Sequence, residues 1–332
     1  MNKCKLPIDS VIAVTYRCNS RCVMCDIWKI KDYPELTLAQ FEKLPSSLRD
    51  INLSGGEPFL RMDLPQIVKV VVERCPQARI VISSNGFATE LIIKQMKEIL
   101  KIKPDIGVAI SIDGLNTIHD EMRGIPGGFE KAITTVKELK KLGMTNLRLG
   151  FTVMEKNINQ LSKVYDLTRE LGIEFTHSFA QSSDFYFGGK QNETHPRKDL
   201  LQREYNYLIN KELKSWNIKK WLRAYFAFGM YNFITSQTPV LDNAPGREFF
   251  FLDPNGTIYP SVVHNVPMAN INELGKLSDF WCSELAKEKR EEIDALKIPV
   301  WMICTARTAI KKHPVKVIFW ILKNKIFGFK IK

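Results

Sequence analysis

The sequence lacks the features that mark secreted, membrane-spanning and repetitive proteins. No run of apolar residues reaches the roughly 18 that a spanning helix requires. Residues 1–9 contain no apolar core of the kind found in a secretory signal. Neither a solenoid repeat nor a low-complexity segment interrupts the chain. We therefore expect a cytoplasmic globular protein.

Acidic residues are absent from the last part of the chain. Residues 307–332 contain one Arg, seven Lys and no acid, so they carry +8 of the formal net charge of +12 and leave +4 for the remainder. Because most of the basicity lies in this segment, we expect no nucleic-acid partner. The segment also contains the apolar run 315–322 and the aromatic residues Phe327 and Phe329. It suits either an interfacial helix on anionic lipid, with peripheral contact at the inner face of the membrane, or a terminal helix docked on the protein with a solvated lysine face.

What is present fits a large folded chain. With 332 residues, 45% of them hydrophobic and 25% charged, the chain can form one large domain and a smaller second one. Strands are predicted at residues 11–16, 51–54, 79–83, 106–112, 147–153 and 174–179, and helices at 37–44, 64–75, 89–100, 129–142 and 159–171. Such strand–helix–strand repeats imply parallel strands with right-handed crossovers. We expect an α/β fold, a partial (β/α)6 barrel whose functional loops lie at the C-terminal ends of its strands.

The second half of the sequence predicts helix and then a small β unit. Residues 197–236 are predicted helical, and their many aromatic side chains favour core packing, with a wall of the substrate cavity as the alternative. Beyond a shift in composition at 238–245, the segments 248–252 and 257–259 flank Asp253-Pro254-Asn255-Gly256, which is a hairpin signal. We predict a loop at 182–195, a barrel domain at 1–237, a smaller α+β extension at 238–306 and a basic amphipathic tail at 307–332.

Three of the seven cysteines, Cys18, Cys22 and Cys25, fall in one loop directly after the first predicted strand. A disulfide framework would spread the cysteines, and a reducing cytoplasm would not maintain it, so the cluster indicates metal ligation. The spacings let one loop reach three irons of a [4Fe–4S] cubane, and the lack of a fourth nearby cysteine leaves one iron open. A zinc site and unliganded core cysteines are the alternatives, but zinc would need a fourth ligand that the loop lacks.

Short polar motifs follow the next three predicted strands. In Gly55-Gly56-Glu57-Pro58 the glycines allow close backbone approach, and Glu57 offers a carboxylate to an ammonium group. Further motifs are Ser83-Ser84-Asn85-Gly86 and Ser111-Ile112-Asp113-Gly114, the latter continuing to His119-Asp120 and Arg123-Gly124. Parallel barrel topology brings all of them to one mouth together with the cysteine loop.

On these motifs the chain resembles the radical SAM family over residues 10–180, since the Cys-x3-Cys-x2-Cys loop is the hallmark of that family. The resemblance implies a [4Fe–4S] cluster on the three cysteines, whose open iron chelates S-adenosylmethionine and whose electron cleaves it to a 5′-deoxyadenosyl radical. It implies that the Gly-Gly-Glu-Pro loop holds the amino group of that cofactor. The resemblance implies that the three cysteines and Asp113 are catalytic, and that Asp113 faces the substrate or caps a turn. The cofactor-binding residues that it implies are Gly55, Gly56, Glu57, Pro58, Ser84, Asn85, Ser111 and Arg123. His119 is expected to be structural.

Residues 246–261 resemble the start of a SPASM or Twitch domain, which usually holds one or two further iron–sulfur clusters. Where that pattern expects cysteines, this chain has Asn243 and Ser261, and near the end only Cys304 remains, with Cys282 as the other candidate. Because two cysteines cannot hold a standard four-ligand cluster, we predict that the domain acts as a lid and substrate wall without an auxiliary cluster. Substitute ligation by His264 or Asp253 is the alternative.

The sequence thus predicts a radical SAM enzyme that abstracts a hydrogen atom from a substrate it does not identify. Oxidation, epimerisation and bond formation are all open as outcomes. An electron donor such as flavodoxin or ferredoxin is the expected protein partner. The alternative is a non-catalytic iron–sulfur or S-adenosylmethionine-binding partner protein, which the missing C-terminal ligands would suit.

Overall fold

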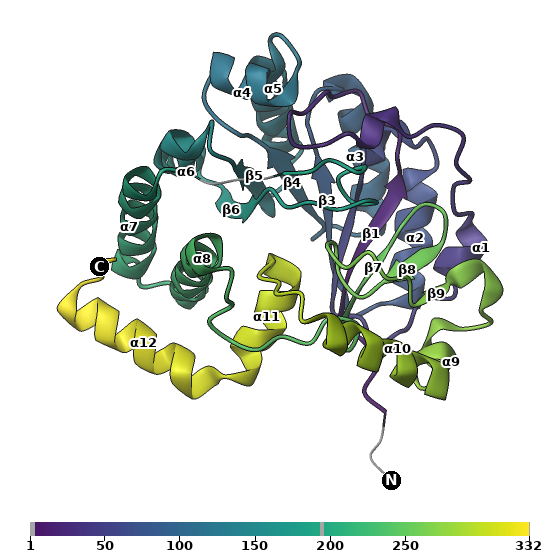
Figure 1. Ribbon diagram of the computed structural model, residues 1–332. Coiled ribbons are helices and arrows are strands. Elements are labelled where there is room, and N and C mark those ends of the chain that lie inside the picture. Colours follow the sequence, from purple (N-terminus) through teal and green to yellow (C-terminus); the bar gives the residue numbers. More distant parts are fainter. Residues whose placement is uncertain (1–3, 193–195, 332) are drawn as a thin grey trace.

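The computed structural model describes residues 4–192 and 196–331, and a nine-stranded sheet forms its centre (Figure 1). The strand order is β6-β5-β4-β3-β2-β1-β7-β8-β9. All neighbours from β6 to β7 are parallel, and β8 and β9 are added antiparallel. The first six strands are β1 (Asp9–Thr15), β2 (Asp50–Gly55), β3 (Arg79–Ser84), β4 (Gly107–Ser111), β5 (Leu147–Val153) and β6 (Glu174–Phe179). The predicted α/β fold with six parallel strands in a partial barrel is confirmed.

Helices cover the outer face of the parallel strands because that face is apolar. Ile12, Leu53, Ile82, Ile110 and Leu149 are completely buried there and belong to the main hydrophobic core. The helices of this part are α1 (Leu38–Phe41), α2 (Leu64–Arg74), α3 (Thr89–Ile102), α4 (Thr117–Arg123), α5 (Gly128–Lys141), α6 (Leu161–Glu170), α7 (Lys198–Lys214) and α8 (Ile218–Ser236). Short 3-10 turns span Ile27–Lys29, Pro58–Leu60, Ile158–Gln160 and Ile271–Glu273. Parallel sheets are stable when both faces are covered in this way.

The inner faces of the same strands line the barrel, since successive side chains of a strand point to opposite faces. The strand registers place at least one hydroxyl residue of each strand from β2 to β6 on this inner face: Ser54, Ser83, Ser111, Thr152, Thr176 and Ser178. Ser83 Oγ donates a hydrogen bond to Asn52 Oδ1 of the neighbouring strand over 2.9 Å. On the β1 side the interior is instead filled by an apolar cluster that includes Val11, Phe251 and Cys304.

The C-terminal region continues the barrel sheet. It contains β7 (Phe249–Leu252), β8 (Thr257–Tyr259), β9 (Ala269–Asn270), α9 (Leu277–Trp281), α10 (Glu284–Leu296), α11 (Ile303–Lys312) and α12 (Pro314–Phe327). The predicted hairpin is present as β7 and β8, but β7 also pairs in parallel with β1. The region is therefore attached to the barrel by backbone hydrogen bonds as well as by side-chain packing.

Two expectations from the sequence are corrected. The stretch 197–236 forms two helices rather than one, because the side chain of Asn217 accepts the backbone N–H of Lys219 and starts α8 afresh. Cys282 is not available to a cluster, since it forms a disulfide with Cys4 and so links the N-terminal segment to the end of α9. The predicted loop at 182–195 is irregular over 182–192, and its last three residues lie outside the described residues.

The N-terminal ends of the strands are closed by α11. Arg307 of this helix forms ion pairs with Asp9 of β1 (3.2 Å) and Asp50 of β2 (2.6 Å). Figure 1 shows α11 and α12 at the lower edge of the molecule, on the side of the sheet opposite α4 and α5. Among the residues that the structure describes, no helix is long and apolar enough to cross a membrane.

Candidate active site

The cysteine loop leaves the C-terminal end of β1 and is fastened to the segment that follows β4. The backbone N–H groups of Arg21 and Val23 donate to the carbonyl oxygens of Arg123 and Met122, each over 2.9 Å. Beneath the loop, Met24, Met122 and Phe187 form a small apolar cluster that also contacts Cys22 and Cys25. Two elements distant in sequence thus hold the loop, which limits how far the three sulfurs can separate.

The three cysteines are half-buried, and polar groups of Ser20 and Arg123 lie beside their sulfurs. Ser20 Oγ lies 3.0 Å from Cys22 Sγ, and the Ser20 N–H donates to Cys18 Sγ over 3.4 Å. Arg123 Nη1 also donates to Cys22 Sγ, over 3.6 Å. Burial raises the pKa of Cys18 and the pKa of Cys25 to about 12 each, and the charges of the neighbouring thiolates add to the rise. Without a bound cation, the thiolate forms of Cys18 and Cys25 are therefore disfavoured.

These residues fit a cubane better than a single metal ion. In the described part of the chain, no three His, Cys, Asp or Glu side chains surround one ion position. A cubane has different requirements, because each thiolate binds a different iron and the ligands are correspondingly further apart. Its positive irons would also offset the burial of the thiolates. Cys75 and Cys304 are buried in other clusters, so Cys18, Cys22 and Cys25 are the cysteines that would hold such a cluster.

The Gly55-Gly56 pair allows the β2 loop to touch the start of the cysteine loop. A Cβ atom on Gly55 would lie 2.3 Å from Thr15 O, and one on Gly56 would lie 2.2 Å from Arg17 O. Because no Cβ atoms are present, the backbones can approach, and the N–H groups of Gly56 and Glu57 donate to the carbonyl oxygens of Thr15 and Arg17, each over 2.8 Å. Any side chain here would separate the loops, so glycine is required for contact between them.

Glu57 links the loops after β2 and β3. Its side chain is completely buried, and its carboxylate accepts the N–H groups of Asn85 (2.7 Å) and Phe59 (3.3 Å). Burial raises the pKa of Glu57 to about 7, although these N–H donors favour the ionised form. Asn85 in turn donates from Nδ2 to Asn19 Oδ1 in the cysteine loop over 2.7 Å. Glu57 and Asn85 therefore brace the cysteine loop, and Pro58 begins the 3-10 turn beside them.

Asp113 and Arg123 form a buried ion pair next to the cysteine loop. Arg123 Nε lies 2.6 Å from Asp113 Oδ2, and Asp113 Oδ1 accepts the N–H of Thr152 over 2.7 Å. The carboxylate is fully buried and directed to these partners. His119 accepts the Asp113 N–H at Nδ1, and burial lowers its pKa to about 3, so it is neutral. Arg123 thus connects Asp113 to Cys22.

Of the remaining predicted residues, Ser111 faces the barrel interior at the end of β4, while Ser84 is buried and accepts the Gly86 N–H over 3.0 Å.

Sequence reasoning missed the contribution of residues 182–192, which cover the cysteine loop. Asp26 N–H donates to Phe187 O over 2.9 Å, and a Cβ on Gly188 would lie 2.4 Å from the Ile27 nitrogen. The Gly188-Gly189 pair is the sequence signal that could have revealed the close approach of residues 182–192 to the cysteine loop.

Ser261 and Asn243 occupy the two positions where the SPASM or Twitch pattern has cysteines, and both side chains form hydrogen bonds. Ser261 Oγ lies 2.6 Å from His264 Nδ1, and both side chains are buried. Asn243 Nδ2 donates to the carbonyl oxygen of Val300. Cys304 packs in the apolar cluster with Phe251.

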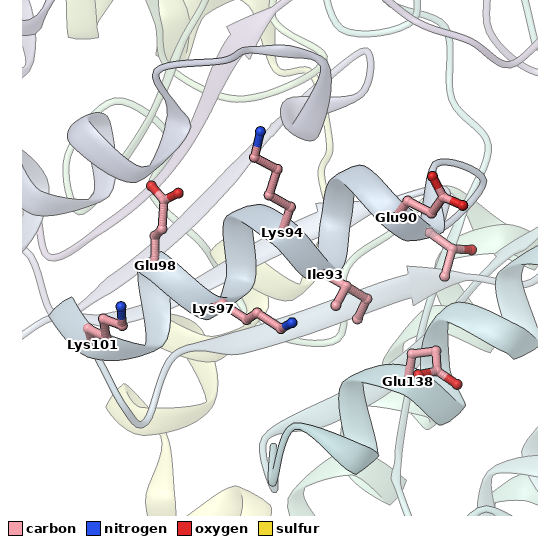
Figure 2. A pocket seen from close by; sticks show the side chains of 8 residues that line it. Glu90, Ile93, Lys94, Lys97, Glu98, Lys101 and Glu138 are labelled. Carbon is pink, nitrogen blue, oxygen red and sulfur yellow. The ribbon is translucent and has the colours of Figure 1, made fainter.

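A separate hollow of about 640 Å³ lies on the outer surface, away from the cysteine loop (Figure 2). Figure 2 shows it along α3, lined by alternating lysine and glutamate side chains such as Lys94 and Glu98, with Glu138 of α5 opposite. These are solvated charged faces of two helices. They give no reason to place chemistry there.

Comparison with known proteins finds similarity to radical SAM proteins. Residues 12–168 match the model of the Radical SAM superfamily. The AdoMet-dependent heme synthase of Methanosarcina barkeri is 30% identical over 174 residues, which are 50% of this chain and 48% of that protein. The mycofactocin maturase MftC of Mycolicibacterium smegmatis is 26% identical over 305 residues, 86% of this chain and 73% of that protein. The chain spans about half the length of the first curated relatives it matches.

Among solved structures, native anSMEcpe with bound AdoMet superposes with a TM-score of 0.62 at 13% identity. The superposition covers 96% of this chain and 100% of that one. At this identity the likeness concerns the fold, and it includes the C-terminal extension as well as the barrel.

Proposed function

We propose that this chain, which belongs to the radical SAM superfamily, is a catalytically active member that generates a substrate radical inside its barrel. In this proposal one [4Fe–4S] cluster is held by Cys18, Cys22 and Cys25. The observation that carries it is the fastening of the cysteine loop to the loops after β2, β3 and β4, all at one end of the barrel. An enzyme that handles a radical needs such a fixed geometry.

When bound, the cluster and S-adenosylmethionine supply a one-electron cleavage that yields a hydrogen-abstracting 5′-deoxyadenosyl radical, with flavodoxin or ferredoxin as the electron donor. The protein supplies position and shielding. Gly55, Gly56, Glu57 and Pro58 would hold the amino group of S-adenosylmethionine. Ser84, Asn85, Ser111 and Arg123 would contact or support the rest of that cofactor.

Asp113 acts in this proposal as a positioning residue. Its carboxylate is buried and occupied by Arg123 and the Thr152 N–H, so it does not reach the barrel interior. By orienting Arg123 it controls the donor that faces Cys22 Sγ.

The barrel interior supports a polar and uncharged substrate group. Hydroxyl side chains from β2 to β6 face the same space, whereas the charged residues of the inner face lie at the starts of the strands, at Asp9, Asp50, Arg79, Arg148 and Glu174. Hydroxyls can donate and accept hydrogen bonds, so they suit carbonyl, amide or hydroxyl groups. Oxidation, epimerisation and bond formation all begin with the same hydrogen abstraction.

The C-terminal region serves as a lid and wall without an auxiliary cluster. Ser261, Asn243 and Cys282 are each occupied by other partners, which supports this view. Reconstituted protein should then contain about four irons per chain, the content of one cubane. A content near twice that value would contradict the proposal.

The decisive experiment is anaerobic reduction with S-adenosylmethionine, followed by measurement of 5′-deoxyadenosine. Cys22→Ala should lose both the cluster and all 5′-deoxyadenosine formation, because two thiolates cannot retain the cubane. Cys304→Ala, a buried cysteine outside the loop, is the matched control and should keep about four irons per chain. A wild-type protein that binds the cluster but forms no 5′-deoxyadenosine would support the non-catalytic partner instead.

A further inference from the structure

Helix α12 has apolar side chains on two opposite faces. One face is docked on the protein: Val317 and Ile321 are buried, and the ring of Trp320 packs on Tyr225 and Phe228 of α8 with centroid distances of 5.2 and 4.9 Å. This face accounts for the attachment of the helix. The second face of α12 has no partner among the described residues.

The second face is an apolar row in solvent. It consists of Val315, Ile318, Phe319, Leu322 and Ile326, which are 51–81% exposed. Their spacing of three, one, three and four residues places them along one side of the helix. The expectation of a docked helix with a solvated lysine face is therefore only half right, since the docked face exists but the solvated face is apolar. An exposed row of this kind marks an interaction surface.

The corner between α7 and α8 extends this surface. Trp216 is 87% exposed, and Ile218 and Leu222 beside it are also exposed. Lys325 of α12 connects the two parts, because its Nζ lies 5.0 Å from the Trp216 ring and donates to the carbonyl oxygens of Leu213 and Ser215. We call this surface, made of the α12 row and the corner 216–222, the α12 face.

Lysines flank the apolar row on both sides. At helical spacing, Lys316 and Lys323 lie along one edge and Lys325 along the other. None of the three has a carboxylate partner in the described part of the chain. By contrast, Arg307, Lys311 and Lys312 of α11 pair with Asp9, Asp50 and Glu248. The only acid within 211–223 is Glu212, which is buried.

We propose that the α12 face docks on an anionic lipid bilayer. An apolar row flanked by lysines that have no carboxylate partner among the described residues, with an exposed Trp at its edge, matches the interfacial zone of such a bilayer. A helix of 14 residues is about 21 Å long, which is less than the roughly 30 Å of a hydrocarbon core, so it lies on the membrane and does not span it. A second copy of this chain would suit the apolar row but not the lysine edges, which would repel one another.

The geometry also fixes the orientation of the docked protein. The α12 face belongs to the end of the barrel that α11 closes, whereas the cysteine loop lies at the opposite ends of the strands (Figure 1). Docking therefore leaves the barrel mouth open to solvent. Lipid binding is accordingly independent of the cluster and of catalysis.

Flotation of the full-length protein tests this with two vesicle types, phosphatidylcholine alone and an equimolar mixture of phosphatidylcholine and phosphatidylglycerol. Wild type should float with the mixture and not with phosphatidylcholine alone. Phe319→Asp combined with Ile326→Asp should lower the vesicle-bound fraction about tenfold or more. Leu285→Asp, at a side chain of α10 that is 53% exposed, is the matched control and should bind as wild type does.

A charge variant separates the contribution of the lysines to lipid binding from that of the apolar row. Lys316→Gln with Lys323→Gln should weaken binding to the anionic mixture, whereas Lys97→Gln with Lys101→Gln on α3 should not. Unchanged flotation of the Phe319/Ile326 variant, or equal binding to both vesicle types, would overturn the proposal. So would a concentration-dependent dimer that this variant abolishes while wild type fails to float, since the face would then pair with a second copy. The Phe319/Ile326 and Leu285 variants should retain the melting temperature of wild type, because the changed side chains are exposed. Lys316→Gln also removes the hydrogen bond from Lys316 Nζ to Val240 O (3.0 Å), so a melting curve must accompany the flotation of the charge variant.

Discussion

The two ends of the barrel differ in how they use charge. At the mouth, Asp113 and Arg123 are buried together, and the loops around them are joined by backbone hydrogen bonds. At the closed end, Arg307 bridges Asp9 and Asp50, and Arg79 and Lys311 reach Asp50 from more exposed positions. At the mouth, one buried ion pair positions the cysteine loop. At the closed end, several ion pairs of increasing exposure hold α11 against the starts of the strands. The α12 face adjoins the second end, away from the chemistry.

The largest effect on stability is expected from breaking the pair at the mouth. Arg123→Met leaves a fully buried carboxylate without its counter-charge, and such changes cost about 3–5 kcal/mol. Urea unfolding of the protein without cluster measures the loss of unfolding free energy. Arg79→Met at the closed end is the control, since this exposed partner of Asp50 should contribute about 0–1 kcal/mol. Equal losses in the two variants would remove the contrast between the ends.

A second effect concerns the covalent link at the closed end. The disulfide between Cys4 and Cys282 joins residues 278 positions apart, so it restricts the unfolded chain strongly. Cys282→Ser should lower the free energy of unfolding by about 2–4 kcal/mol in the absence of reductant. Wild type unfolded in the presence of reductant should match the variant. If reductant leaves wild type unchanged, the two thiols are not paired in the purified protein.

The smallest effect is a pH dependence from Asp9. Burial raises the pKa of this carboxyl to about 7, although the charge of Arg307 acts in the opposite direction. Because the folded state keeps the proton while the unfolded state loses it near pH 4, Asp9 lowers stability as the pH rises from about 4 to about 7. Asp9→Asn cannot ionise, so its stability relative to wild type should increase by about 2 kcal/mol between pH 5 and pH 7. Chemical unfolding at pH 5 and pH 7 measures this difference, and a constant difference would contradict the assignment.

The repeating patterns were predictable because they depend on neighbouring residues. The alternation of apolar strands and amphipathic helices predicts β1 to β6 within a few residues at each end. The cysteine spacing and the Gly-Gly-Glu-Pro motif likewise indicate the cluster loop and its neighbour. The short α4 was not predicted, because its polar run from His119 to Arg123 has little helical periodicity of its own.

By itself, the sequence determined the chemistry that the chain can carry: three thiols in one loop, glycines where backbones meet, and a basic, aromatic end. Only the tertiary structure decided the partners of individual side chains. It paired Asp113 with Arg123, Cys4 with Cys282 and β7 with β1, and it left the apolar row of α12 in solvent. The physical reason is that periodicity and turn propensity act over a few residues. Burial and ion pairing depend instead on which distant segments the folded chain brings together.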